Sequence, residues 1–118
     1  MSKEVLDLTQ QLLTYNQQLL EYFHEAREKD IQYDFDKTIK PFANKVKSAV
    51  EKWNIELRNW LLRNPQKHLH MKQIDTTIEH LEQLSIQAFF PKTSKSRLIN
   101  SNRTVEFFLQ EVIKAMTK

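Results

Sequence analysis

One short stretch decides how this chain folds, and it reads Gln87-Ala88-Phe89-Phe90-Pro91-Lys92-Thr93-Ser94-Lys95-Ser96-Arg97. The residues before it follow a helical repeat that ends in two adjacent phenylalanines. Pro91 stops that helix, because proline lacks a backbone N–H and disfavours the helical conformation of the residue before it. Ser94, or Thr93, can cap a following helix with its hydroxyl oxygen. The stretch therefore predicts a tight corner between two helices, with at least one of the two phenylalanines buried beneath it.

Composition restricts the fold class. The chain has 118 residues, no glycine and no cysteine. A β-rich domain of this length would need glycine in its hairpin turns and bulges, so helices joined by short polar turns are expected. Without cysteine the chain can form no disulfide, no thiolate metal site and no cysteine nucleophile. The length suits one domain that spans residues 1–118.

Four segments carry apolar residues at alternating spacings of three and four, which is the repeat of an amphipathic helix. The predicted helices run over about residues 3–29, 36–64, 71–90 and 95–116. Trp53 and Trp60 are the largest side chains expected in the core. Short connections imply that successive helices are antiparallel neighbours. We therefore expect an all-α fold, an antiparallel up-down-up-down four-helix bundle.

Pro41 restricts where the second helix can begin. Proline is tolerated in the first turn of a helix, where its missing N–H would be unpaired in any case. The regular helix can therefore start within about three residues before Pro41. The alternative is a looser turn that begins at Asp34 and is followed by a kink at Pro41.

A set of short motifs points to a family. They are Tyr33-Asp34-Phe35, Ile39-Lys40-Pro41-Phe42, Trp53, His70 with Gln73-Ile74, and the stretch from Gln87 to Lys95 followed by Arg97. By these residues the chain resembles the YppE-like family, a group of small bacterial proteins of unknown function. The resemblance implies a four-helix bundle and a cytoplasmic bacterial protein, and it supplies no catalytic residues.

The sequence gives no indication of a signal peptide or of a membrane-spanning segment. Its first residues mix charged with apolar side chains and lack the apolar block of a signal peptide. No apolar run approaches the roughly 20 residues that span a bilayer. The net charge of +3 is only mildly basic. We expect a cytoplasmic protein that does not bind membranes.

An enzymatic role would need a group of residues that the sequence does not offer. Metal sites in helical bundles use a Glu-x-x-His pair on each of two helices. Glu21 and His24 have that spacing, but no such glutamate precedes His80. We expect His24 and His80 to be solvated surface imidazoles, and His68 and His70 lack a carboxylate partner. The prediction is a non-enzymatic protein without catalytic residues, metal or cofactor; a metal-dependent bundle enzyme is kept as an alternative.

Basic residues suggest a further function. They are Lys37, Lys40, Lys45 and Lys47 in the second helix, with Lys92, Lys95, Arg97 and Arg103 around the third connection. Acidic neighbours are plentiful, and the aromatic residues that would stack on bases are expected mostly in the core. Weak nucleic-acid binding through the basic face of the second helix is therefore kept as an alternative.

The first and third connections should lie at the same end of the bundle. Aromatic residues and charges of both signs would meet there, which suits a small recognition patch. The predicted patch consists of Tyr33, Asp34, Phe35, Lys37, Lys40, Lys92, Thr93, Lys95 and Arg97. We expect a protein-interaction or adaptor module with an unknown protein partner, monomeric or weakly homo-oligomeric. Alternatively, Asp34 and Asp36 only pair with Lys95 and Arg97 and so lock the two connections together.

Overall fold

Four long helices and one short π-helix make up the computed structural model, which describes residues 2–117. They are α1 (Ser2–Lys29), η1 (Phe35–Ile39), α2 (Lys40–Arg63), α3 (Met71–Gln87) and α4 (Lys95–Met116). Helices account for 83% of the structure, and no strand occurs within residues 2–117. The prediction of an all-α fold is confirmed.

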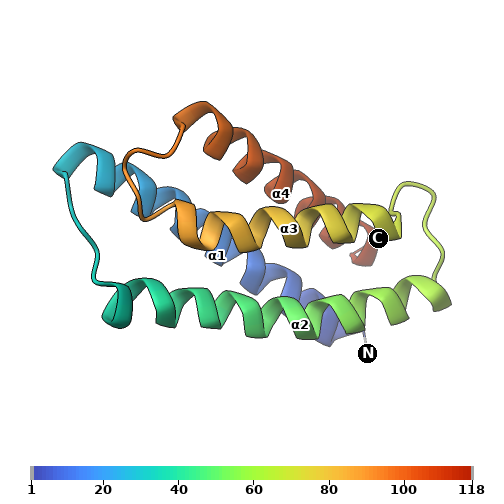
Figure 1. Ribbon diagram of the computed structural model, residues 1–118. Helices are drawn as coiled ribbons and strands as arrows, with labels where there is room; N and C mark the ends of the chain where they lie inside the picture. The colour runs from blue at the N-terminus through green and yellow to red at the C-terminus, as the bar shows by residue number, and fades with distance from the viewer. Residues whose placement is uncertain (1, 118) are drawn as a thin grey trace.

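Successive helices run in opposite directions and form a bundle (Figure 1). α1 packs against α2 and α4, α3 packs against the same two helices, and α1 meets α3 only slightly across the bundle. The predicted antiparallel up-down-up-down bundle is thus confirmed. The connections after α1 and after α3 lie at one end, on the left of Figure 1, and the connection after α2 lies at the other.

The core is a continuous cluster of apolar side chains from all four long helices. Trp53 is fully buried, and its indole Nε1 donates a hydrogen bond to Thr9 Oγ1 at 3.0 Å. The prediction for Trp60 was wrong, because this side chain is only partly buried at the edge of the cluster. A step of seven residues falls short of two full helical turns and rotates the position by about 20°. Leu57 and Leu61 therefore take the inward positions, and both are buried.

Two buried asparagines tie α1 to α4. Asn16 Nδ2 donates to the backbone carbonyl oxygen of Asn102 at 2.9 Å, and Asn102 Nδ2 donates to the carbonyl oxygen of Asn16 at 2.8 Å. A buried amide without partners is costly, so these reciprocal bonds favour one axial position of α1 against α4. The sequence patterns pointed to neither residue, because both asparagines break the apolar repeat.

The regular part of the second helix begins at Lys40, within three residues of Pro41 as predicted, and a short π-turn that follows Asp34 precedes it. Asp34 Oδ1 accepts a hydrogen bond from the Lys37 N–H at 2.7 Å, and the π-turn of η1 follows before α2 begins at Lys40. In a regular α-helix the ring of Pro41 would press on the carbonyl group four residues earlier. The wider turn relieves that contact, and Pro41 then lies in the first turn of α2.

The third helix ends at Gln87, three residues before the predicted bound. The chain tightens after it, because the Phe89 N–H bonds the Ile86 carbonyl oxygen at 3.3 Å and the Phe90 N–H bonds that of Gln87 at 3.1 Å. Pro91 excludes a helical conformation for the residue before it, which explains the early end. The two phenylalanines therefore lie on a turn, where they point in different directions.

Candidate functional site

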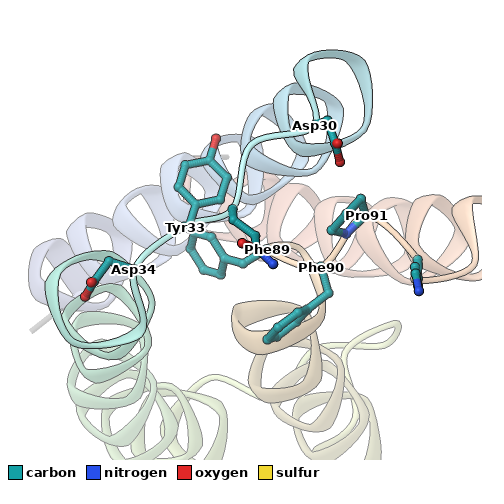
Figure 2. A pocket seen from close by; sticks show the side chains of 8 residues that line it. Asp30, Tyr33, Asp34, Phe89, Phe90 and Pro91 are labelled. Atoms are coloured by element: carbon teal, nitrogen blue, oxygen red, sulfur yellow. The ribbon is translucent and has the colours of Figure 1, made fainter.

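The connections after α1 and after α3 together form an open hollow of about 770 Å³ (Figure 2). Its lining is shared between the two: Asp30, Gln32, Tyr33 and Asp34 from the first, and Phe89, Phe90, Pro91 and Lys92 from the third. We call this part of the molecule, residues 30–39 and 88–97, the loop end. It contains eight of the nine residues of the predicted patch; Lys40, the first residue of α2, follows directly.

Aromatic rings from α1, α2 and both connections form the floor of the hollow. The Phe89 ring centroid lies 4.8 Å from that of Tyr22, 5.4 Å from that of Tyr33 and 6.0 Å from that of Phe42. Tyr22 also meets Tyr33 and Phe42 edge to face. Phe89 is only 2% exposed, so the expectation that one phenylalanine of the pair is buried is confirmed. Aromatic pairs of this geometry stabilise the floor beyond the burial of apolar area alone.

Phe90 is the outward member of the pair. Its side chain is 47% exposed at the edge of the hollow. Phe35, in η1, is 57% exposed at the same end of the bundle. Phe35 was predicted as a patch residue, and the sequence left open which of Phe89 and Phe90 would face outward. Both belong to turns, where the helical repeat no longer determines which side chains face inward.

Tyr33 connects the floor to α1. Its hydroxyl donates a hydrogen bond to Glu25 Oε2 at 3.0 Å. Partial burial, this hydrogen bond and the negative charge of Glu25 raise the pKa of Tyr33 from 10.0 to about 12. The phenol is therefore a neutral donor at physiological pH, and it fixes the first connection against the last turns of α1.

Arg27 holds the third connection in place. Its Nη1 donates to the carbonyl oxygens of Pro91 at 3.3 Å and Thr93 at 3.4 Å, and its guanidinium carbon lies 5.5 Å from the centroid of the Phe23 ring. The Thr93 hydroxyl donates to the Gln87 carbonyl oxygen at 3.0 Å, which satisfies the end of α3. Thr93, a predicted patch residue, thus has a structural role.

The predicted lock between the two connections is not ionic. The ion pairs of the described chain are Arg58–Asp75, between α2 and α3, and Glu111–Lys114 at 3.3 Å within α4. Asp34 and Asp36 therefore do not pair with Lys95 and Arg97, and that expectation was wrong. Asp34 caps η1 instead, the Tyr33 ring of the first connection contacts the Phe89 ring of the third, and Arg27 binds the third connection from α1. A carboxylate that accepts a hydrogen bond from the first turn of a helix already has a polar partner and does not need a distant cation.

The remaining patch residues surround the hollow without lining it. Lys37, Lys40, Lys95 and Arg97 are exposed, and the backbone N–H of Arg97 is bound by the capping hydroxyl of Ser94 at 3.5 Å. Asp30 and Gln32 line the hollow but were missing from the predicted patch. Their position directly after a predicted helix end was the available signal.

Asp30 has an unusual backbone conformation, with φ at 50°. This left-handed region follows the end of α1, a place where glycine is the usual residue, and aspartate tolerates it better than most side chains do. The Asp30 carboxylate forms no hydrogen bond or ion pair with any other residue between 2 and 117. Its charge is therefore open to solvent and to any ligand in the hollow.

The histidines do not form a common site. His24 and His80 are partly buried, so the prediction of solvated surface imidazoles was wrong, and His80 Nδ1 is buried without a hydrogen-bond partner. His68 and His70 are exposed. No group of three or more histidine, aspartate or glutamate side chains with the geometry of a metal site occurs in the described part of the chain. None of its helices is both long and apolar enough to cross a bilayer.

A second, smaller hollow of about 440 Å³ lies between the start of α3 and the second half of α4. Phe107 lines it and is 68% exposed, which makes it the most exposed phenylalanine described. It lies away from the loop end and provides an internal reference for tests of that end.

Comparison with solved structures shows which fold this is. A protein of unknown function from Listeria innocua has a TM-score of 0.93 and 21% identity, with 98% of this chain and 92% of that chain covered. The crystal structure of YppE from Bacillus subtilis has a TM-score of 0.92 and 21% identity, covering 97% and 93% of the two chains. At such identities the likeness shows the fold alone.

Comparison of sequences shows the family. The uncharacterised protein YppE of Bacillus subtilis (strain 168) is 21% identical over 112 residues, which are 95% of this chain and 91% of YppE. The resemblance inferred from the short motifs is thereby confirmed. A family model described as a bacterial domain of unknown function, DUF1798, matches residues 9–116, nearly the whole chain. The chain belongs to the DUF1798 family.

Proposed function

We propose that this protein is a non-catalytic interaction module, and that it binds a partner protein through the loop end. One observation carries the proposal: Phe90 is exposed at the edge of a hollow whose floor contains the buried Phe89, and Phe35 is exposed at the same end of the bundle. Large apolar side chains that remain exposed next to a cavity are typical of binding surfaces. We include in the proposal a cytoplasmic location and a monomeric or weakly homo-oligomeric state.

The loop end has the properties of a prepared binding surface. Phe89 anchors the third connection among three other rings, and Arg27 holds the carbonyl groups on either side of Lys92. Neither connection therefore needs to become ordered when a partner binds. Binding to an ordered surface avoids the entropic cost of fixing loops, which favours affinity.

The test compares two exposed phenylalanines. Phe90→Ser removes an apolar side chain at the loop end, and Phe107→Ser removes one at the second hollow. Surface substitutions usually change stability by less than about 0.5 kcal/mol, so both variants should keep the melting temperature of the wild type. Proteins captured by affinity pull-down from the source bacterium should be lost with Phe90→Ser and kept with Phe107→Ser. Capture that is unchanged by Phe90→Ser would contradict the proposal.

A second candidate function is weak binding of single-stranded nucleic acid. Phe35 is exposed in the same short helix as Lys37, and Lys40, Lys45 and Lys47 follow on the exposed side of α2. Exposed aromatic rings beside basic residues suit base stacking together with phosphate contacts. A salt titration of oligonucleotide binding decides between the candidates, because phosphate contacts make the affinity fall steeply with salt. Affinity that Phe35→Ala and Lys37→Ala both reduce would favour the nucleic acid over the protein partner.

A further inference from the structure

The hollow at the loop end lies at the negative ends of two helices. Its first group of lining residues begins at Asp30, directly after α1, and its second begins at Phe89, two residues after α3. The carboxyl end of a helix carries a partial negative charge, because the peptide dipoles align and the last carbonyl groups lack partners within the helix. The amino end of η1, which carries the opposite partial charge, lies at the same hollow and is capped by Asp34, so the side chains of the lining decide the sign of the charge.

The side chains of the lining have a net negative charge. Asp30 and Asp34 contribute two carboxylates against the single ammonium group of Lys92. Asp30 has no partner among residues 2–117, and Asp34 accepts only the Lys37 backbone N–H. The nearby guanidinium of Arg27 is already engaged with two carbonyl oxygens and the Phe23 ring. The hollow therefore has an excess of negative charge that this chain does not neutralise by direct contact.

Aromatic rings complete the surroundings. Figure 2 shows Tyr33 and Phe89 between Asp30 and Asp34, with Phe90 beside them. The rings of Tyr33 and Phe90 are the accessible ones, because Phe89 is almost fully buried. Aromatic faces attract cations, and guanidinium groups stack on them especially well. Carboxylates and rings around one hollow are therefore complementary to an arginine side chain, or less closely to lysine.

From these observations we infer that the hollow receives a cationic side chain, above all arginine, from the partner protein. The inference rests on the proposed function and adds to it the chemistry of the partner. Asp30 and Asp34 attract the charge, Tyr33 and Phe90 contact the alkyl chain and the face of the guanidinium, and Lys92 opposes binding from the rim.

Three short peptides test the inference directly. They are acetyl-Ala-Arg-Ala-amide, the same peptide with citrulline in place of arginine, and the same peptide with glutamate. Amide resonances of the isotope-labelled full chain are followed by NMR at millimolar peptide. The arginine peptide should give saturable shifts centred on residues 30–34 and 89–92, and the neutral and acidic peptides should not. Equal shifts with citrulline, shifts centred elsewhere or no binding of the arginine peptide would each overturn the inference.

Substitutions of the charged lining residues test whether negative charge in the hollow strengthens binding of the arginine peptide. Asn tolerates the left-handed conformation of residue 30 and can cap the helix at residue 34, so Asp30→Asn with Asp34→Asn should keep the fold. That double variant should bind the arginine peptide about tenfold more weakly, the effect of two exposed charges. Lys92→Ala should bind it about two- to fivefold more tightly, whereas Lys95→Ala, outside the lining, should not change binding. Tighter binding by the double variant, or weaker binding by Lys92→Ala, would contradict the inference.

The pull-down separates the two proposals. A partner that Phe90→Ser loses but that Asp30→Asn with Asp34→Asn keeps at full affinity would leave the interaction function standing and remove the arginine inference. Both proposals together predict that each variant loses the partner. They also predict that, of the three peptides, only the arginine peptide binds.

Discussion

At the loop end two connections pack against each other over a floor of aromatic rings, whereas the other end is closed by residues 64–70 alone. Contacts at the loop end join residues far apart in the chain, such as Arg27 and Pro91. The hydrogen bonds at the other end are local: Asn64 Nδ2 donates to the Trp60 carbonyl oxygen, and the His70 N–H donates to Gln73 Oε1. The difference indicates that the loop end is held by tertiary contacts and the other end mainly by its own turns.

The largest expected difference concerns the buried anchor of each end. Phe89→Ala should lower the free energy of unfolding by about 3–5 kcal/mol, because it removes a ring that three other rings contact. Leu69→Ala, at the other end, should lower it by about 2 kcal/mol, since a short local connection can collapse into the space. Urea unfolding measures both values. An equal or larger loss with Leu69→Ala would show that the two ends are held alike.

A smaller difference is expected for one arginine at each end. Arg27→Ala removes two hydrogen bonds to the third connection and should cost about 1 kcal/mol. Arg63→Ala removes only a long bond of 3.5 Å to the Asn59 carbonyl oxygen within α2, so its cost should stay below about 0.5 kcal/mol. Thermal unfolding of the two variants side by side is the measurement. If the two variants have the same melting temperature, Arg27 does not stabilise the third connection.

Tyr33→Phe tests the loop end at alkaline pH. At pH 8 the variant should be less stable than the wild type by about 0.5–1 kcal/mol, because the hydrogen bond to Glu25 is lost. Tyr33 ionises near pH 10 in the unfolded chain and near 12 in the folded one. The unfolded wild type therefore loses its proton first, and the advantage over Tyr33→Phe should shrink between pH 10 and 12. A constant difference across that window would mean that Glu25 and burial do not act on this phenol.

The smallest expected effect compares the residues that follow two helices. Asp30→Gly should stay within about 0.5 kcal/mol of the wild type, because glycine gains freedom in the unfolded chain but fits the positive φ of this position. Asn64→Gly should cost about 1 kcal/mol, since residue 64 has a negative φ and its side chain binds the Trp60 carbonyl oxygen. Replicate chemical unfolding experiments resolve the difference in unfolding free energy between the two variants. A larger loss with Asp30→Gly than with Asn64→Gly would be the opposite of this expectation.

The fold could be predicted from the sequence because each long helix carries its own apolar repeat. Pro91 and Pro41 fixed the ends of elements to within a few residues, and the juxtaposition of the first and third connections followed from the antiparallel order. The error at Trp60 arose where a seven-residue spacing was extended over several turns. Local spacing was informative as long as the pattern covered only a few turns.

The site was less predictable, because it depends on contacts that no local pattern contains. The sequence could not decide which of Phe89 and Phe90 is buried, since both lie on a turn and packing against Tyr22 and Phe42 makes the choice. The expected ion pairs across the loop end failed because the backbone N–H of Lys37 takes the carboxylate of Asp34. The bond between Asn16 and Asn102 joins positions 86 residues apart, beyond any local signal.

The π-turn of η1 has a consequence for changes in chain length. Its hydrogen bonds span one residue more than those of an α-helix, so deletion of one residue within 36–38 would leave an ordinary α-helical turn ahead of Pro41. Residues from Lys40 onward would keep their register against the core. The Phe35 carbonyl oxygen, which accepts the N–H of the residue five positions later, Lys40, would accept the same N–H as an ordinary α-helical bond, so Phe35 would keep its place at the loop end. The deletion would thus leave the surface of the loop end unchanged and would instead press the ring of Pro41 on the carbonyl group four residues before it, which lowers stability.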